Sequence, residues 1–126
     1  MNPRFLGAWL LDSFESQLAD GTVSRPWGDD PLGIIYWDES GHFAVQLGPR
    51  VAGAAGDYLS FYGTASATDG ESGAITLSVV GSSSAERVRG DQVRDFFFVE
   101  PRLLRMRPPV GSNGSQSTFK WRRASA

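Results

Sequence analysis

The sequence contains no cysteine and a single histidine, His42, among its 126 residues. The absence of cysteine excludes a disulfide framework, a thiolate metal site and a cysteine nucleophile. One histidine with scattered carboxylates is a poor basis for a zinc or iron site. No window approaches the roughly 18 apolar residues that span a bilayer, and the N-terminus lacks the apolar core of a secretory signal. We therefore expect no bound metal, no membrane span and a cytoplasmic protein.

Sequence motifs for nucleotide or nucleophilic chemistry are also missing. There is no Gly-x-Ser-x-Gly elbow, and Gly53-Ala54-Ala55-Gly56 does not lie between a strand and a helix as a phosphate loop would. The pattern predicts no cofactor, so any chemistry would have to proceed without one.

The charge is small overall but unevenly distributed. The formal net charge is -2, which argues against nucleic acid as a partner. Residues 1–71 hold ten acidic and three basic side chains, whereas residues 72–126 hold four acidic and nine basic ones. The simplest explanation of this asymmetry is that acidic side chains of the first half form ion pairs with basic side chains of the second half. An anion-binding surface built from the C-terminal arginines is the sharper alternative.

Two-residue alternation of apolar and polar side chains dominates the chain, and helical periodicity is scarce. Turn signals such as Asp20-Gly21, Glu39-Ser40-Gly41 and Asp69-Gly70 separate the alternating segments. We read residues 26–32 as a crossing loop with room for one helical turn, and residues 48–57 as a glycine- and alanine-rich loop. The predicted strands cover residues 7–16, 33–38, 42–47, 58–68, 74–80, 102–107 and 117–123, with two strand-like pieces within 87–99.

Eight or nine short antiparallel strands favour a sandwich or a barrel, and 15 glycines favour the barrel. We expect one domain over residues 1–126. Strand parity predicts the buried side chains Phe43, Val45, Leu47, Ile75, Leu77, Val79, Leu104 and Met106. The segment 92–99 fits either parity, so Arg94 or Asp95 points inward.

The motifs resemble those of a known family. Gly7-x-Trp9 at the head of the first strand, together with Trp-Arg-Arg at residues 121–123, is similar to the lipocalin signature. More specifically, GAWLLDSFE, PWGDDPLGIIYWDESGHFAVQL, FYGTA, GDQVRDFFF and FKWRR occur in an order that resembles the bacterial and fungal lipocalin-like domain family. One departure is that the strand ITLSVV has Leu77 and Ser78 where the family often has histidine, so histidine-dependent activity is not carried over.

The resemblance implies an all-β fold, a single antiparallel up-and-down β-barrel of about eight strands. It also implies that Gly7, Trp9 and Arg123 close one end, with the arginine stacked on the tryptophan, as a structural plug. A barrel of this size is either filled by side chains or encloses one small ligand.

Two functions from different classes remain open, beside a purely structural barrel. The first is binding of a small hydrophobic or aromatic molecule in the barrel cavity. This molecule could also carry an acidic group, which Arg94 would bind. The second is a cofactor-independent cyclase or isomerase for a polyketide or terpenoid substrate, with Glu15 and Tyr62 as catalytic groups. A regular strand places Glu15 on the same face as Trp9, whereas a β-bulge between them would turn it outward. Apolar residues Leu10 and Phe14, expected on the outer face, make a homodimer conceivable. The predicted ligand-binding residues are Tyr36, Phe43, Val45, Gln46, Tyr62, Leu77, Arg94, Phe96 and Met106.

Overall fold

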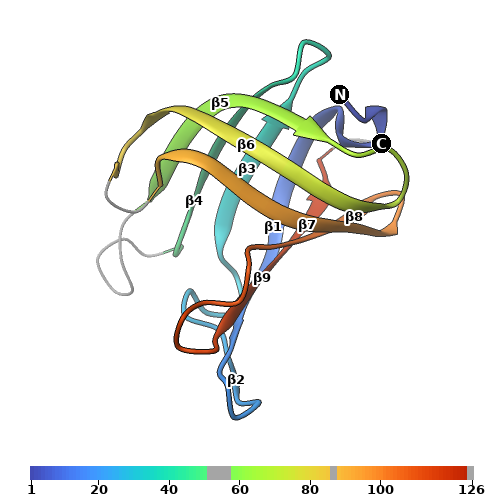
Figure 1. Cartoon of the computed structure of the whole chain (residues 1–126). Helices are drawn as coiled ribbons and strands as arrows, with labels where there is room; N and C mark the ends of the chain where they lie inside the picture. Colours follow the sequence, from blue (N-terminus) through green and yellow to red (C-terminus); the bar gives the residue numbers. More distant parts are fainter. Residues whose placement is uncertain (51–57, 86–87, 125–126) are drawn as a thin grey trace.

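The computed structural model describes residues 1–50, 58–85 and 88–124 (Figure 1). Most of the predicted loop at 48–57, and the start of the predicted strand piece at 87, lie outside the described residues. A short 3-10 helix, η1 (Pro3–Phe5), precedes nine strands. These are β1 (Gly7–Gln17), β2 (Val23–Ser24), β3 (Leu32–Trp37), β4 (His42–Gly48), β5 (Leu59–Ala67), β6 (Ser72–Ser82), β7 (Gly90–Glu100), β8 (Leu103–Arg107) and β9 (Gln116–Arg123).

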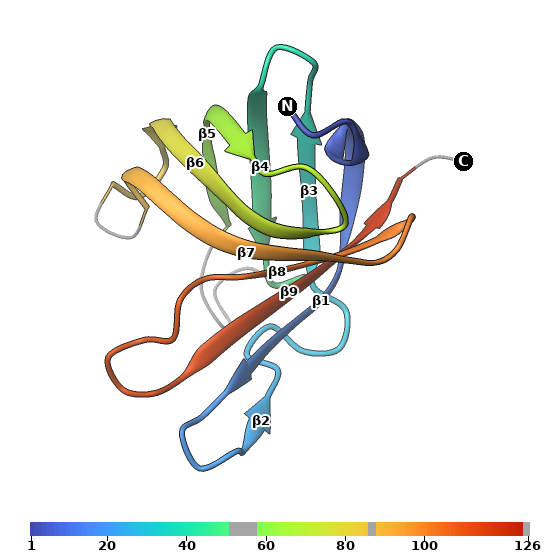
Figure 2. The same cartoon turned by 45° about the vertical axis from the view of Figure 1, so that its right-hand side comes forward.

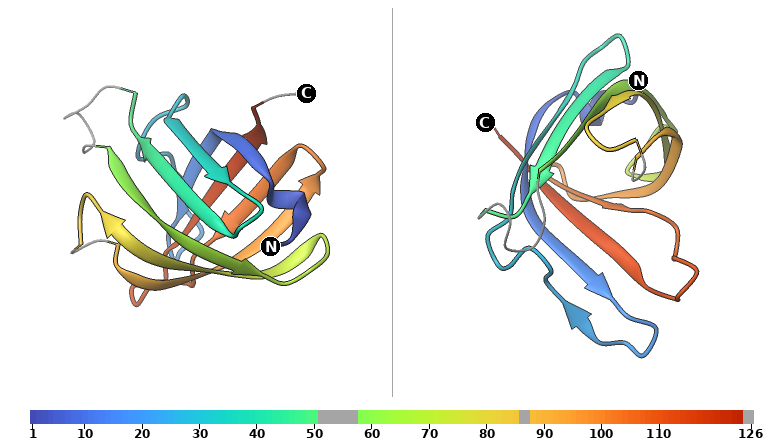
Figure 3. Two further views of the ribbon diagram at one scale, coloured as in Figure 1. Left: turned by 90° about the horizontal axis from the view of Figure 1, so that it is seen from above. Right: turned by 90° about the vertical axis from the view of Figure 1, so that its left-hand side faces the viewer.

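Eight of these strands form a closed antiparallel barrel, which confirms the predicted fold class. Consecutive strands from β3 to β9 pair as neighbours, and β1 pairs with both β3 and β9 to close the ring. The ring is visible in the right-hand view of Figure 3. The two-residue strand β2, which alternation alone does not predict, pairs only with Ser16 and Gln17 at the end of β1.

The turns follow the predicted glycine signals. Gly41 and Gly70 adopt φ values of +86° and +96°, a left-handed conformation that suits glycine, and they end the β3–β4 and β5–β6 turns. Two expectations differ from the structure. The segment 90–100 is one continuous strand, and the helical turn lies at Pro3–Phe5, where Pro3 fixes φ and Asn2 caps the turn, instead of within 26–32.

A β-bulge in β1 changes which side chains face inward. The register of β1 against β9 shifts between Leu11 and Ser13. Because one extra residue is inserted there, the inward parity passes from Leu11 to Phe14. β1 pairs with β3 only as far as Leu10, and beyond the bulge β1, β9 and β2 project from the barrel as a flared arm (Figure 1).

One end of the barrel is closed by an aromatic cluster around η1. Phe5 is fully buried and makes edge-to-face contacts with Trp37, Phe96 and Phe98, at centroid distances of 5.2, 4.9 and 5.0 Å. The side chain of Asn2, itself buried, donates to the carbonyl oxygens of Thr68 and Gly70, both at 3.0 Å. Figure 2 shows η1 lying across this end, beside the start of β1. The plug therefore ties the N-terminus to the β5–β6 turn.

Candidate functional site

The other end of the barrel contains an apolar cavity of about 260 Å³. Its wall comes from every barrel strand and from two connecting loops. Apart from Arg94 and Ser117, all of the lining side chains are apolar or aromatic. They are Phe14, Trp27, Ile35, Val45, Leu47, Leu59, Phe61, Leu77, Val88, Met106, Phe119 and Trp121. A mostly apolar hollow with few polar groups is the usual form of a small-molecule site.

Among the described residues, Arg94 is the one charged side chain on the cavity wall. It shares the inward face of β7 with the buried Phe96 and Phe98, whereas Asp95 is exposed on the outer face. Its Nη1 donates to the carbonyl of Val93 at 3.0 Å, and its Nη2 lies 3.5 Å from Oε1 of Gln92. Burial lowers the pKa of the Arg94 guanidinium from its usual value.

In the described part of the chain, this partly desolvated charge has no ion-pair partner. Within residues 1–50, 58–85 and 88–124, no carboxylate oxygen lies within 4.0 Å of the Arg94 guanidinium. A cation in an apolar surrounding is stabilised most by a hydrogen-bonded anion. The cavity therefore has an apolar wall and one point at which negative charge would be favoured.

Three aromatic side chains form the wall where the arm leaves the barrel. Phe14 and Phe119 are directly opposite on β1 and β9 and stack with a centroid distance of 4.7 Å and an interplanar angle of 16°. Trp27, in the loop before β3, lies 4.4 Å from the Phe14 ring. All three are half-buried and line the cavity, so an apolar ligand would contact aromatic surface here.

The predicted ligand-binding residues divide into three groups. Val45, Leu77, Arg94 and Met106 lie on the cavity wall. Phe43 and Phe96 are buried but belong to the packed core beside it. Tyr36, Gln46 and Tyr62 lie on the outer face of the barrel. Each of these three alternates with a buried neighbour on its strand, and the two tyrosines are 56% and 55% exposed.

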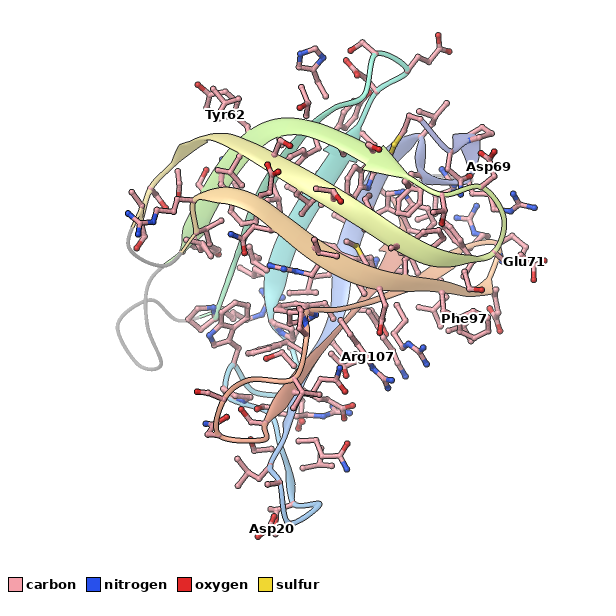
Figure 4. All side chains as sticks on the ribbon, in the orientation of Figure 1. Asp20, Tyr62, Asp69, Glu71, Phe97 and Arg107 are labelled. Carbon is pink, nitrogen blue, oxygen red and sulfur yellow. The ribbon has the colours of Figure 1, made fainter. Side chains whose placement is uncertain are left out.

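The two residues predicted as catalytic are also outside the cavity, which corrects that expectation. The bulge in β1 turns Glu15 outward, where its carboxylate pairs with Arg25 at 3.2 Å. The Tyr62 ring projects from the outer surface (Figure 4) and lies against Gly81, its partner on β6. Among the described residues, no carboxylate, phenol or imidazole lines the cavity. The acid–base pair of the cyclase hypothesis therefore does not reach it.

Phe14 faces inward where the sequence predicted an outward side chain, so the sequence analysis missed its place in the site. We expected it on the outer face as part of a dimer surface, but the same bulge brings it onto the cavity wall. Phe119 and Trp121 were also missed as lining residues, whereas Trp27 is an aromatic candidate for the interior that the list of ligand-binding residues omits. The signal for Trp121 and Phe119 was present in the alternation of the last strand, since both share the inward parity.

The closed end contains the predicted Gly7, Trp9 and Arg123. The Arg123 guanidinium lies 4.3 Å from the centre of the Trp9 ring. It also donates to the carbonyl oxygens of Leu6 and Arg4 at 2.6 and 2.8 Å. Gly7 has φ +106°, and a side chain there would meet Arg123 Nη1 at 3.4 Å. This arrangement is far from the cavity and is structural.

Comparison with known proteins agrees with this architecture. A family model described as a lipocalin-like domain matches residues 6–124. The chain belongs to the lipocalin-like domain family. This confirms the resemblance seen in the sequence motifs, and it makes the barrel compatible with small-molecule binding. No curated protein matches this lipocalin-like chain at a significant level.

Solved structures share the fold at low sequence identity. A redesigned β-barrel is 13% identical over 98% of this chain and 94% of its own, with a TM-score of 0.56. A de novo designed fluorescence-activating β-barrel is 14% identical over 96% and 94% of the two chains, with a TM-score of 0.51. At such identities the likeness concerns the barrel alone. In the described residues, no helix is long and apolar enough to cross a membrane, and no group of three or more His, Asp or Glu side chains is placed to hold a metal ion.

Proposed function

We propose that this lipocalin-like protein binds a small apolar or aromatic molecule that carries one anionic group, with the anion held by Arg94. The observation that carries the proposal is the Arg94 guanidinium on an otherwise apolar wall, without a carboxylate within 4.0 Å among the described residues. An arginine presents a planar fork of donors that matches a carboxylate or sulfonate.

The size and shape of the site restrict the ligand. A cavity of about 260 Å³ lies just below the range of roughly 300–1,000 Å³ typical of drug-sized ligands. One or two fused rings fit this space better than an extended chain. The Phe14, Trp27 and Phe119 rings on the cavity wall would supply aromatic contacts for a flat ring.

The experiment compares 2-naphthoate with its neutral analogue 2-naphthamide. Trp27 and Trp121 line the cavity, so tryptophan fluorescence reports occupancy directly. We expect naphthoate to bind more tightly than naphthamide. Since removing one partner of a desolvated charge pair costs at least about tenfold in affinity, Arg94→Gln should weaken naphthoate by that factor. Naphthamide binding should change less than about threefold.

Arg102→Gln is the matched control, because Arg102 is exposed at the β7–β8 turn and does not line the cavity. This variant should bind both probes as the wild type does. If neither probe binds to the wild type, the binding function is refuted. If both bind equally well and Arg94→Gln changes neither, the cavity binds apolar molecules but the anionic specificity is wrong.

A further inference from the structure

The outer face of the barrel contains a second concave site, separate from the cavity. A groove of about 300 Å³ lies where β7 and β8 meet the flared arm of β1 and β9. Three basic side chains line it: Arg105 and Arg107 from β8, and Lys120 from β9. Figure 4 shows Phe97 and Arg107 projecting outside the barrel wall at this side of the molecule. The ligand cavity contains none of these residues.

Two of the cations face each other across neighbouring strands. Arg105 and Lys120 are direct partners in the β8–β9 register. Like charges in directly opposite positions destabilise a sheet. The Arg105 guanidinium lies 5.2 Å from the centre of the Phe97 ring, which holds it over β7, and its Nε is buried without a hydrogen-bond partner among the described residues.

The nearby carboxylates do not neutralise these cations. In the described parts of the chain, no carboxylate oxygen lies within 4.0 Å of Arg105, Arg107 or Lys120. Glu15 lines the groove but is engaged by Arg25 at 3.2 Å. Asp95 is the direct β7 partner of Arg107, yet Arg107 directs its Nε to the hydroxyl oxygen of Thr118 at 3.1 Å.

From these contacts we propose that the groove binds the phosphate or sulfate group of a small soluble molecule. A tetrahedral oxyanion offers several acceptor oxygens, which two guanidinium groups and one ammonium group can share. Its charge would remove the repulsion between Arg105 and Lys120. An anionic membrane surface fits less well, since Asp95 and Glu100 are exposed on β7 beside the groove.

The first test measures thermal stability in sodium phosphate, sodium sulfate and sodium chloride at equal ionic strength. Phosphate and sulfate should raise the Tm of the wild type more than chloride does. Lys120→Gln should raise the Tm in chloride, because it removes the repulsion. In phosphate and sulfate this variant should keep only the general stabilisation that these excluded salts give any protein, so its extra rise should be smaller than that of the wild type. A Lys120 that served only the fold would give a lower Tm in every salt. Equal Tm values in all three salts, or an unchanged phosphate effect in Lys120→Gln, would overturn the proposal.

Direct binding is measured by calorimetry with inorganic phosphate and with glycerol 3-phosphate, which is too polar for the apolar cavity. Arg107→Gln and Lys120→Gln should each weaken binding at least about fivefold. Arg122→Gln is the matched control: Arg122 lies on the same outer face of β9 but pairs with Asp12 at 3.6 Å, and it should alter binding less than twofold. Binding to phosphatidate vesicles without binding of either soluble phosphate would overturn the proposal in favour of a membrane surface.

Discussion

Arg123 provides the sharpest test of how the barrel is closed. Its guanidinium joins the last strand to the N-terminal plug through two carbonyl bonds and one aromatic face. A hydrogen bond from a charged donor contributes about 1.5–3 kcal/mol, and the second bond, to Arg4, is exposed and should count for less. A cation–π contact adds about 0.5–1 kcal/mol at a partly exposed site. Arg123→Ala should therefore destabilise the protein by about 3 kcal/mol.

The assay is differential scanning calorimetry. Unfolding entropy is about 2.1 cal/mol/K per residue, so for 126 residues each kcal/mol corresponds to about 4 °C in Tm. Arg123→Ala should lower the Tm by about 12 °C. Arg123→Lys keeps the cation near Trp9 but cannot donate to both carbonyls in a fork, so about half of the loss should remain.

Arg122→Ala is the matched control, because the neighbouring arginine makes one exposed ion pair with Asp12. Such pairs contribute about 0–1 kcal/mol, and the Tm should fall by no more than about 4 °C. Equal losses for Arg122→Ala and Arg123→Ala would refute the reasoning. A Tm of Arg123→Lys equal to that of the wild type would show that a positive charge at this position is sufficient to stabilise the closed end, without the two hydrogen bonds of the guanidinium group.

Two further changes test the sheet and its turns. Gly63→Ala would place a Cβ against the carbonyl oxygen of Ser78, so urea unfolding should show a loss of about 3 kcal/mol in the free energy of unfolding. A loss no larger than that of the loop variant Gly111→Ala would contradict this expectation. Hydrogen bonds from the Ser40 hydroxyl and the His42 backbone N–H lower the pKa of Asp38 from its usual value of 3.8. The stability that these hydrogen bonds contribute is therefore fully present above pH 3.8 and is lost as the pH falls through the lowered pKa. Asp38→Ala should thus have a lower Tm than the wild type at pH 7 and the same Tm in strong acid, and a difference independent of pH would exclude this role.

Strand alternation predicted most of the interior because regular strands obey it. The side chains expected inside β4, β6 and β8, such as Val45, Leu77 and Met106, are buried. The same alternation places Gln46 on the outer face of β4, so predicting Gln46 as a ligand-binding residue was inconsistent with the alternation rule. Arg94 and Asp95 could not be separated by pattern, because both faces of that segment contain apolar residues. Pairing of β7 with β6 and β8 decides the matter, and such pairing is a long-range property of the sheet.

The bulge in β1 explains the two largest errors in the predicted facing of side chains, those for Phe14 and Glu15. No residue type marks it, since Leu11, Asp12 and Ser13 would all suit a regular strand. By adding one residue, it reverses the facing of Phe14 and Glu15. A regular β1 would put a carboxylate on the cavity wall and an aromatic ring in solvent.

The bulge in β1 lies between the part of the strand that closes the barrel and the part that forms the arm. The first residues of β1 pair with β3 and β9 at once, which completes the ring around the plug. The last β1–β3 pair is at Leu10, just before the bulge. Beyond it β1 pairs with β9 and, at its end, with β2, so the sheet opens on the β3 side and forms the arm. Phe14 and Phe119 lie on the inner surface of this opening, and the basic groove lies on its outer surface. The bulge thus determines that Phe14 faces the candidate ligand cavity and that Glu15 faces the proposed oxyanion groove, on opposite sides of the same pair of strands.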